Sequence, residues 1–372
     1  MWFVIRVLGV AALVVVTLTA LRLTTGGYRV EPVAVLAPAT ADSVCRPAVD
    51  QPDRSLWLDG DQAAEQAWAA EAPGPDDEYI VGPNGWLFWS DFMESYASQA
   101  VGRAHLDAQE IQRWIDYLTS VRDGLAADGI EFIVVVPPST SSVYPEELPE
   151  WMQDLRGPTI MDQLLDSSSD LPIVDMRTPL RDAKGAEHPI YSASNSHWTP
   201  YGAYVGWQQI AECTPQLYPE QQGLRTPIVA GVSAPTVANE WVNAGAESIG
   251  PDWSTLEFGE SFQPVTRTDA AGVISVRAGE ETTDAADLPA STSVPTSWTG
   301  KSAVILRDSM GNDLSPYWQQ AYSPTWQLPS DADLVEFPSF RDYVSAFSPD
   351  VVIFELAERH LINVPPAGRG YE

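Results

Sequence analysis

The chain has 372 residues, and its 51 acidic and 20 basic side chains give a formal net charge of −31 and an isoelectric point near 4.2. This negative charge argues against binding to nucleic acid, whose phosphates attract basic surfaces, and against electrostatic docking on anionic lipid. The length is sufficient for one large hydrophobic core or for two modest domains.

The N-terminal stretch is apolar. Apart from Arg6, the residues from Trp2 to Leu21 are compatible with hydrocarbon. A helix needs about 20 such residues to cross a bilayer. We therefore predict a single transmembrane signal anchor over residues 1–23. The alternative is a secretory signal peptide cleaved after small residues, for which Ala39-Thr40-Ala41 has suitable residue types but lies far beyond the apolar run.

The chain has two cysteines, Cys45 and Cys213, and both follow the predicted anchor. One disulfide between them would suit an oxidising compartment, and the alternative is two unrelated buried thiols. Arg6 precedes the apolar run and Arg22 follows it, so charge does not fix the orientation of the anchor. Cysteine usage favours export, and we predict a single-pass protein of the cell membrane whose globular part is extracytoplasmic.

Residues 24–78 are predicted to form a flexible tether, because Pro and Ala are frequent there and hydrophobic periodicity is weak. Ordered structure is expected in one domain over residues 79–372. A hairpin begins this domain, since Tyr79–Val81 and Trp86–Trp89 are apolar runs on either side of an Asn84-Gly85 turn.

Helices and apolar strands are then expected to alternate. Apolar residues recur every three or four positions over residues 106–127, which predicts an amphipathic helix, and the β-branched run 132–136 predicts a strand. Further helices are expected at 161–165, at 201–213 and through 319–320, and further strands at 171–175, 302–306 and 351–354. This order is typical of an α/β fold with a parallel sheet. Residues 222–300, rich in Thr, Ser, Ala, Gly and Pro, predict a loop-rich β excursion.

A serine follows the strand predicted at 302–306, in the segment Arg307-Asp308-Ser309-Met310-Gly311. A side chain at the carboxyl end of a central strand lies where α/β sheets bind ligands. Ser309 is therefore a candidate nucleophile, and its own and neighbouring amides could point at a developing oxyanion at the start of the next helix. The alternative is an ordinary helix N-cap.

A histidine lies in the polar loop directly before the helix predicted at 201–213. His197 could take the proton of a serine nucleophile, because imidazole titrates near neutral pH, and Asn195 could hydrogen-bond its other ring nitrogen. The alternative is a histidine packed against Trp198. His188 and His360 are isolated and His105 begins a helix, and no Cys/His spacing typical of zinc is present, so we predict no metal site.

Four pieces of the sequence occur in a definite order. They are Gly85-Trp86-Leu87-Phe88, Val136-Pro137-Pro138 followed by Val143-Tyr144-Pro145, Ser196-His197-Trp198, and Asp308-Ser309. Together they resemble the SGNH-hydrolase-like domain of the alginate O-acetyltransferases of the bacterial periplasm, the AlgJ and AlgX type. The resemblance spans residues 79–365 and implies a flavodoxin-like three-layer α/β fold.

The resemblance implies that Ser309 is a nucleophile that carries a transient acetyl group and that His197 is its base. The family has Asp-x-His-Trp, so its orienting carboxylate maps onto position 195, where this chain has Asn195. An aspartate fixes the imidazole tautomer and stabilises the imidazolium, and an amide does neither fully. Asp308 or Asp175 could substitute through space.

Further candidates for supporting roles in the site are Asp308, Trp198, Tyr144 and Arg359. The chain also departs from its relatives after Pro138, where they tend to carry a lysine and this chain has Ser139-Thr140-Ser141-Ser142. A contact of that lysine with donor or glycan would be missing here.

By resemblance, the chain is an exported, membrane-tethered O-acetyltransferase that moves an acetyl group through an acyl-serine to hydroxyls of a cell-surface or secreted polysaccharide. A membrane-bound O-acyltransferase would supply the acetyl group, so no soluble cofactor is expected. Two alternatives stay open. One is a carbohydrate acetylesterase on the same fold, and the other is a catalytically degenerate glycan-binding or scaffold protein, for which Asn195 is the main support.

Overall fold

The computed structural model describes residues 44–49, 56–168, 170–185, 188–221, 223–247, 250–330, 337 and 339–372. The anchor predicted at residues 1–23 lies outside these ranges. Within them, no helix combines the length and the apolar character that crossing a bilayer requires.

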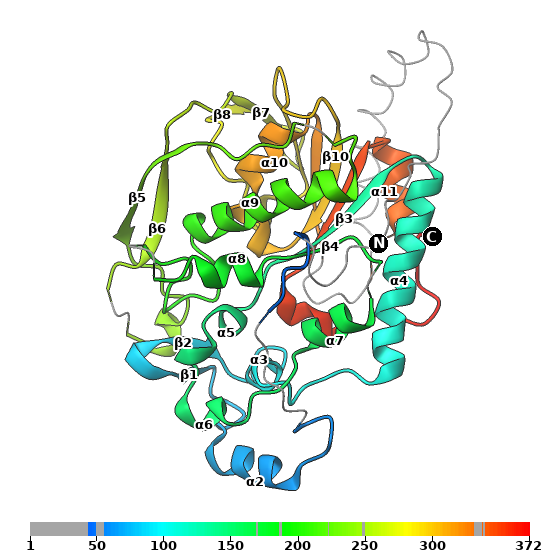
Figure 1. Cartoon of the computed structure of the whole chain (residues 1–372). Coiled ribbons are helices and arrows are strands. Elements are labelled where there is room, and N and C mark those ends of the chain that lie inside the picture. Colours follow the sequence, from blue (N-terminus) through cyan, green and yellow to red (C-terminus); the bar gives the residue numbers. More distant parts are fainter. Residues whose placement is uncertain are drawn as a thin grey trace.

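A mixed sheet of eight strands is the largest sheet in the described part of the chain (Figure 1). Its spatial order is β4 (Ile173–Asp175), β3 (Glu131–Val136), β12 (Val351–Glu355), β10 (Ala303–Arg307), β11 (Thr325–Pro329), β9 (Ala290–Ser293), β7 (Val265–Thr268) and β8 (Ile274–Arg277). The strands from β4 to β11 are parallel, and β9, β7 and β8 add antiparallel pairings. Two separate antiparallel pairs are β1 (Tyr79–Val81) with β2 (Leu87–Trp89), and β5 (Val229–Thr236) with β6 (Trp253–Phe258).

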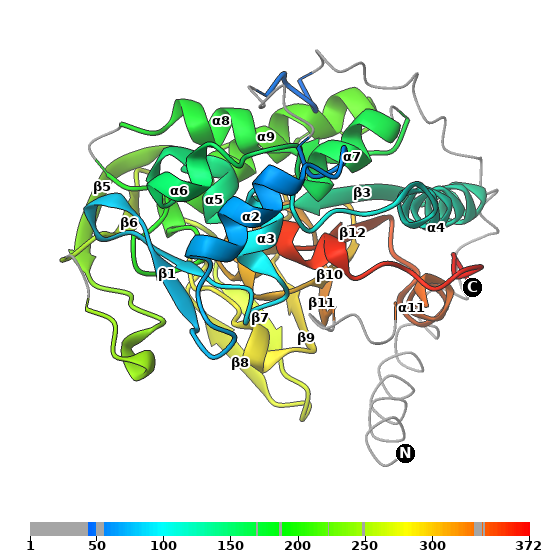
Figure 2. The same cartoon turned by 90° about the horizontal axis from the view of Figure 1, so that it is seen from below.

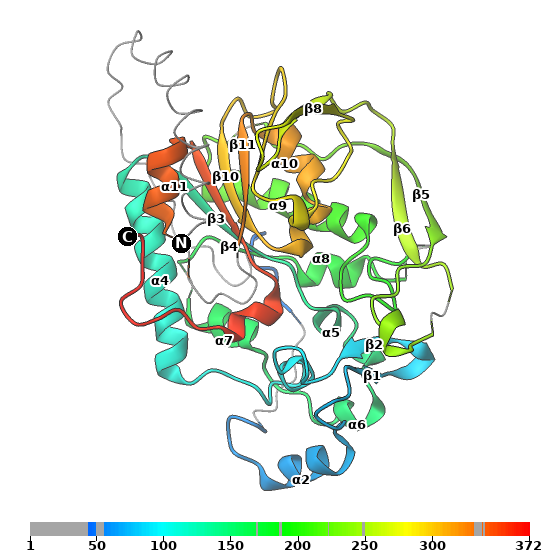
Figure 3. The same ribbon diagram turned by 180° about the vertical axis from the view of Figure 1, so that it is seen from behind.

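Helices cover both faces of the parallel strands. The described α-helices are α2 (Gln62–Glu71), α3 (Tyr96–Ala100), α4 (Ala108–Ala127), α5 (Thr140–Val143), α6 (Glu150–Gln153), α7 (Ile160–Ser167), α8 (Arg177–Asp182), α9 (Pro200–Leu217), α10 (Ser315–Ala321) and α11 (Phe340–Phe347). Side chains alternate along β3, so that Ile133 and Val135 pack with α8, α9 and α10, whereas Phe132 and Val134 pack with α4, α7 and α11. Accordingly, α9 lies in front of the strands in Figure 1 and behind them in Figure 3.

The expected three-layer α/β architecture is therefore present, and the expected core helices and strands are found close to their predicted positions. The sheet differs from the prediction in two respects. It is mixed rather than parallel, because the 222–300 excursion contributes β7, β8 and β9 to it. In addition, the last parallel strand, β12, lies between β3 and β10, which is not the flavodoxin order.

The position of β12 matters for the site. The chain passes from β3 outward to β4 on one side, and from β10 outward to β11 on the other. Connections that diverge in this way leave a crevice at the carboxyl ends of the central strands. Here β3, β12 and β10 end beside one another.

Part of the segment predicted as a tether is folded onto the domain. Helix α2 begins after Asp61, whose side chain accepts from two amides of the first turn, and it buries Trp68 beside Trp57. Both rings belong to a third apolar cluster with residues of the β1–β2 hairpin, α3 and α6. Figure 2 shows α2 beside α6. The expectation of flexibility is thus wrong for residues 62–71, because aromatic burial there outweighs the weak periodicity.

The two cysteines predicted to pair, Cys45 and Cys213, are joined by a disulfide, with 4.7 Å between their Cα atoms. The bond links the first described segment to the C-terminal half of α9, and both side chains are buried in the cluster on that face of the sheet.

Candidate active site

Ser309 lies just beyond the carboxyl end of β10, beside the end of β12. The preceding residue, Asp308, fixes the turn: its carboxylate accepts from the amides of Met310 and Ala357, both at 2.8 Å. Its own amide donates to Oε2 of Glu355 on β12, at 2.9 Å. These bonds tie the turn to both strands, so the position of the serine is set by the sheet.

The carboxylate of Asp308 is used in hydrogen bonds at this turn and in an ion pair with the buried His360. Burial alone would raise the pKa of Asp308, but the charges of His360 and Arg359 and the two backbone hydrogen bonds lower it. Nε2 of His360 lies 3.6 Å from its Oδ2. Asp308 thus supports the serine turn and does not replace the family's aspartate.

The helix expected after the serine is one 3₁₀ turn, Ser309–Asn312, before α10 begins. The Met310 amide donates to Asp308 rather than towards a substrate, so the expectation that neighbouring amides serve an oxyanion is wrong for this one.

His197 lies against the serine. Its Nε2 is 2.9 Å from Oγ of Ser309, although 112 residues separate them in the chain. The neighbouring Trp198 is fully buried and donates from its indole nitrogen to the Met310 carbonyl at 3.0 Å. Trp198 therefore joins the histidine loop to the serine turn as a structural support.

Asn195 holds the opposite side of the imidazole. Its Oδ1 accepts from the His197 amide at 2.9 Å and lies 3.1 Å from Nδ1. A backbone amide only donates, so the oxygen of the Asn195 side chain must face the histidine. Nδ1 then carries the proton, and Nε2 presents its lone pair to Ser309. The amide fixes the tautomer that a general base requires.

A carboxylate also reaches the histidine, from a residue that sequence analysis missed. Oε2 of Glu240 lies 3.7 Å from Nδ1 of His197. It accepts from the Ser196 amide at 2.6 Å, and both carboxylate oxygens accept from the Ser196 hydroxyl. Burial would raise the pKa of Glu240, but the charge of His197 and the hydrogen bonds from Ser196 outweigh burial and lower the pKa. Glu240 lies in the excursion, where no spacing or motif distinguishes it.

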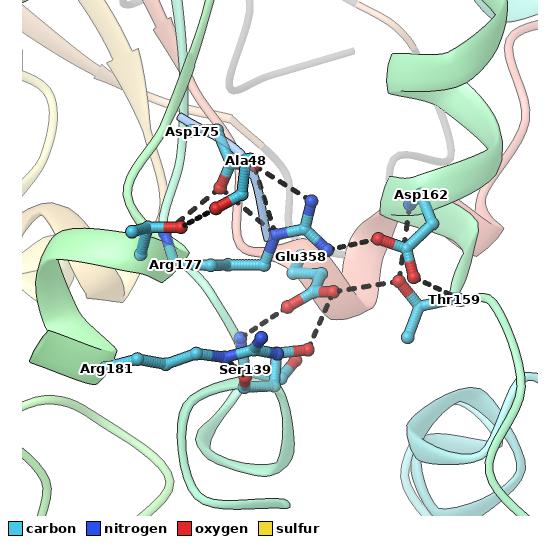
Figure 4. Close-up of polar contacts among 10 residues, drawn as sticks. Ala48, Ser139, Thr159, Asp162, Asp175, Arg177, Arg181 and Glu358 are labelled. Atoms are coloured by element: carbon cyan, nitrogen blue, oxygen red, sulfur yellow. Dashed lines mark hydrogen bonds and ion pairs between the residues drawn. The ribbon is translucent and has the colours of Figure 1, made fainter. Parts of the chain in front are cut away.

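Asp175, the other carboxylate proposed to substitute, belongs to a different cluster (Figure 4). It binds the guanidinium of Arg177, with the Nη2–Oδ2 distance at 2.9 Å, and Arg177 also pairs with Asp162. The serine run after Pro138 faces the same cluster: Glu358 accepts from the amide of Ser139 at 2.8 Å.

The two remaining candidates make contacts outside the serine–histidine pair. Tyr144 packs on Trp86, with ring centroids 4.4 Å apart, and burial raises its pKa to about 12, so the phenol is neutral. Nε of Arg359 pairs with Oε2 of Glu94 at 3.5 Å. In the described part of the chain, no group of three or more His, Cys, Asp or Glu side chains is arranged to hold a metal ion.

Residues 79–358 match the family model described as the SGNH hydrolase-like domain of the acetyltransferase AlgX. The chain belongs to this family. It is 25% identical over 302 residues to a protein of Azotobacter vinelandii named "Probable alginate O-acetylase AlgJ", and the match covers 76% of this chain and 69% of that protein. The resemblance inferred from the four motifs is thereby confirmed.

Solved structures also match the AlgX-type domain. Bacillus cereus PatB1 with a sulfonyl adduct gives a TM-score of 0.54 at 16% identity, covering 76% of this chain and 97% of that one. A DHHW family protein of Eubacterium siraeum gives 0.53 at 13% identity, covering 77% and 92%. At these identities the likeness shows the fold. The chain therefore shares its overall fold with these two proteins.

Proposed function

We propose that this protein is an O-acetyltransferase that moves an acetyl group through an acyl-serine at Ser309 to hydroxyls of a cell-surface or secreted polysaccharide. The observation that carries the proposal is the 2.9 Å contact between Ser309 Oγ and His197 Nε2 at the carboxyl end of a central strand, in a domain of an acetyltransferase family.

The chemistry needs an acetyl ester donor and a sugar hydroxyl. Nε2 of His197 takes the proton of Ser309 as Oγ attacks the acetyl carbonyl, and it returns this proton to the leaving group of the donor. An acceptor hydroxyl then gives its proton to His197 and attacks the acetyl-serine. The sugar ester leaves, and Ser309 regains a proton from His197. Each proton and each bond is accounted for without a metal or a redox partner.

The polysaccharide acceptor is inferred from a relative named as a probable alginate O-acetylase, so alginate-like hydroxyls are one candidate class. We further propose that the protein is exported and held at the cell membrane by residues 1–23, with a membrane-bound O-acyltransferase as its source of acetyl groups. An acyl relay of this kind gains from a tether, which raises the effective concentration of the enzyme at its donor.

The proposal is tested with the full chain, a chromogenic acetyl ester as donor and an oligosaccharide as acceptor. Mass spectrometry should find acetylated Ser309 and acetylated sugar, and Ser309→Ala should lower transfer by more than about 10³-fold. Ser297→Ala, which changes a loop serine outside the site, serves as the matched control.

Other results would change the assignment. Acetyl-serine that releases acetate at the same rate with and without glycan indicates an acetylesterase. A Ser309→Ala variant that retains both glycan binding and cellular function, with no acyl-serine in the unsubstituted protein, indicates a scaffold protein.

A further inference from the structure

The His197 imidazole becomes positively charged each time it accepts a proton during the proposed reaction. Two side chains lie near its Nδ1: the neutral oxygen of Asn195 at 3.1 Å and the carboxylate of Glu240 at 3.7 Å. The amide fixes the tautomer but adds no charge, whereas a carboxylate about 4 Å away stabilises a cation, and more strongly where water is partly excluded.

We propose that Glu240 is a positioning residue that supplies the negative charge for His197, while Asn195 supplies control of its tautomer. Two residues from separate segments would then share the work of the one aspartate in the family's Asp-x-His-Trp motif. The inference rests on the proposed function in one respect, namely that His197 is the base for Ser309.

The carboxylate is held in place by the histidine loop itself. Glu240 is bound by the Ser196 amide and hydroxyl, and its own amide donates to the Ser194 carbonyl at 3.1 Å. Its side chain is 19% exposed, and these bonds together with His197 keep its pKa below the ordinary value. Glu240 therefore stays ionised at neutral pH within reach of the imidazole.

The chain after Glu240 is fixed to the domain at two points. The next residue, Trp241, is buried against Trp89 of β2, with ring centroids 5.2 Å apart. Asp252 accepts from the Ser192 hydroxyl at 2.8 Å and from the Ala193 amide at 2.7 Å. The excursion and the histidine loop are thus joined by hydrogen bonds. The position of Glu240 beside the site is fixed by these contacts.

The alternative is that Glu240 has a purely structural role and only anchors Ser196 through hydrogen bonds. Glu240→Gln separates the two roles, because the amide oxygen still accepts from Ser196 while the charge is lost. Ser196→Ala does the reverse by removing one hydrogen bond and keeping the charge. The control is Glu257→Gln, an exposed glutamate on β6 of the same excursion. Asp313, whose charge also acts on His197, is left unchanged in every variant.

The full chain of each variant is treated with a sulfonyl fluoride probe, and the rate of Ser309 labelling is followed against pH. Glu240→Gln should label about 10–100-fold more slowly at neutral pH, and the acidic limb of its profile should move to lower pH by about one unit, because the imidazolium is less stable. Adding Asn195→Asp to Glu240→Gln should restore most of the rate and return the limb. Glu257→Gln should match the unsubstituted protein.

Several results would overturn the proposal. One is Glu240→Gln labelling at the original rate with an unmoved limb. Another is Ser196→Ala and Glu240→Gln being slowed equally with no movement of the limb, which would indicate an anchor. If Glu240→Gln does not fold, Asn195→Asp alone decides: a change under about threefold is expected where Glu240 already supplies the charge, and a gain above about tenfold contradicts it.

The proposed function can fail separately. If Ser309 of the unsubstituted protein is never labelled, modification of His197 by diethyl pyrocarbonate, read by peptide mass spectrometry, replaces the probe. Its onset at lower pH in Glu240→Gln supports the charge role while Ser309 loses its assignment as nucleophile. An unmoved onset overturns the charge role.

Discussion

The parallel core and the excursion at residues 222–300 differ in how they bury their side chains. Every residue of β10 and β12 is buried, whereas β5 has no buried residue and β6 has one. The core supplies Ser309 at a place that any sheet of this order provides, and the excursion supplies Glu240. The buried strands therefore position Ser309, while an insertion with fewer buried strand residues positions the Glu240 carboxylate near His197.

This difference bears on the proposal that Glu240 supplies the charge that Asn195 lacks. A loop that packs through a few anchors, such as Trp241 and Asp252, accepts sequence change more readily than a strand buried on both faces. A carboxylate near His197 can therefore come from the excursion as well as from position 195. The following predictions test this division, from the largest expected effect to the smallest.

In the proposed mechanism His197 takes the proton of Ser309, so its loss should exceed any effect of a change in the excursion. We expect His197→Ala to lower acetyl transfer and Ser309 labelling by roughly 10³-fold or more, since the serine loses its general base. Stopped-flow or discontinuous assays with the chromogenic ester would measure this loss. His105→Ala, at an exposed position outside the site, should leave both rates unchanged. Comparable losses in the two variants would contradict the assignment.

Packing should matter more in the core than in the excursion. Ile305 on β10 is fully buried, and Ile305→Ala should lower the free energy of unfolding by about 2–5 kcal/mol. Leu256 on β6 is partly exposed, and Leu256→Ala should cost less than about 1.5 kcal/mol. Urea denaturation of both variants measures the difference. Equal losses would mean that the excursion is packed as firmly as the core.

The hydrogen bonds of Asp252 join the excursion to the histidine loop. Their loss should slow Ser309 labelling without changing the charge near His197. Asp252 accepts from two donors, and Asp252→Asn leaves one of them facing an amide NH₂. We expect Ser309 labelling to slow by up to about tenfold and the free energy of unfolding to fall by about 1–2 kcal/mol. The acidic limb of the labelling profile should stay in place. Its movement would mean that Asp252 also acts on the imidazole charge.

Asp313 follows the serine turn, and its pKa is raised, whereas that of Glu240 is lowered. Burial, partly opposed by the charges of His197 and Arg307, raises the pKa of Asp313 to about 6 from an ordinary value of 3.8. The folded state therefore binds this proton more tightly than the unfolded chain does, and stability is lost as pH rises from about 4 through about 6.

Asp313→Asn removes that loss. The variant should gain up to about 3 kcal/mol in free energy of unfolding relative to the unsubstituted protein at pH values above the raised pKa, and the gain should shrink towards acid. Denaturant titrations at several pH values would show this trend. Asp166→Asn, at an exposed position on α7, should give a difference that does not vary in this way.

The core was largely predictable from sequence because its elements have clear patterns: α4 shows three- and four-residue spacing, and β3 and β12 each contain at least four consecutive apolar residues. Strand β11 was missed. Its segment contains Gln327 and Pro329, and Gln327 is buried because it accepts from the guanidinium of Arg307. A buried polar pair of this kind has no signature in either partner's local sequence.

The candidate site was predictable to the same extent. Ser309 lies at the end of a clearly apolar strand, and His197 and Asn195 lie in a motif, so the sequence indicates all three as candidates, and the structure brings them together. Glu240 was not indicated, because its approach depends on a fold-back of 43 residues fixed by Trp241 and Asp252. Contacts between distant segments place that carboxylate near His197, and the local sequence around Glu240 does not indicate them.

Helix α9 connects the histidine loop to the disulfide. His197 lies just before its first turn, and Cys213 lies near its last, so the two are about 20 Å apart along the helix axis. A force applied to the chain before Cys45 would therefore act through the disulfide on the C-terminal end of α9 and not on the histidine loop.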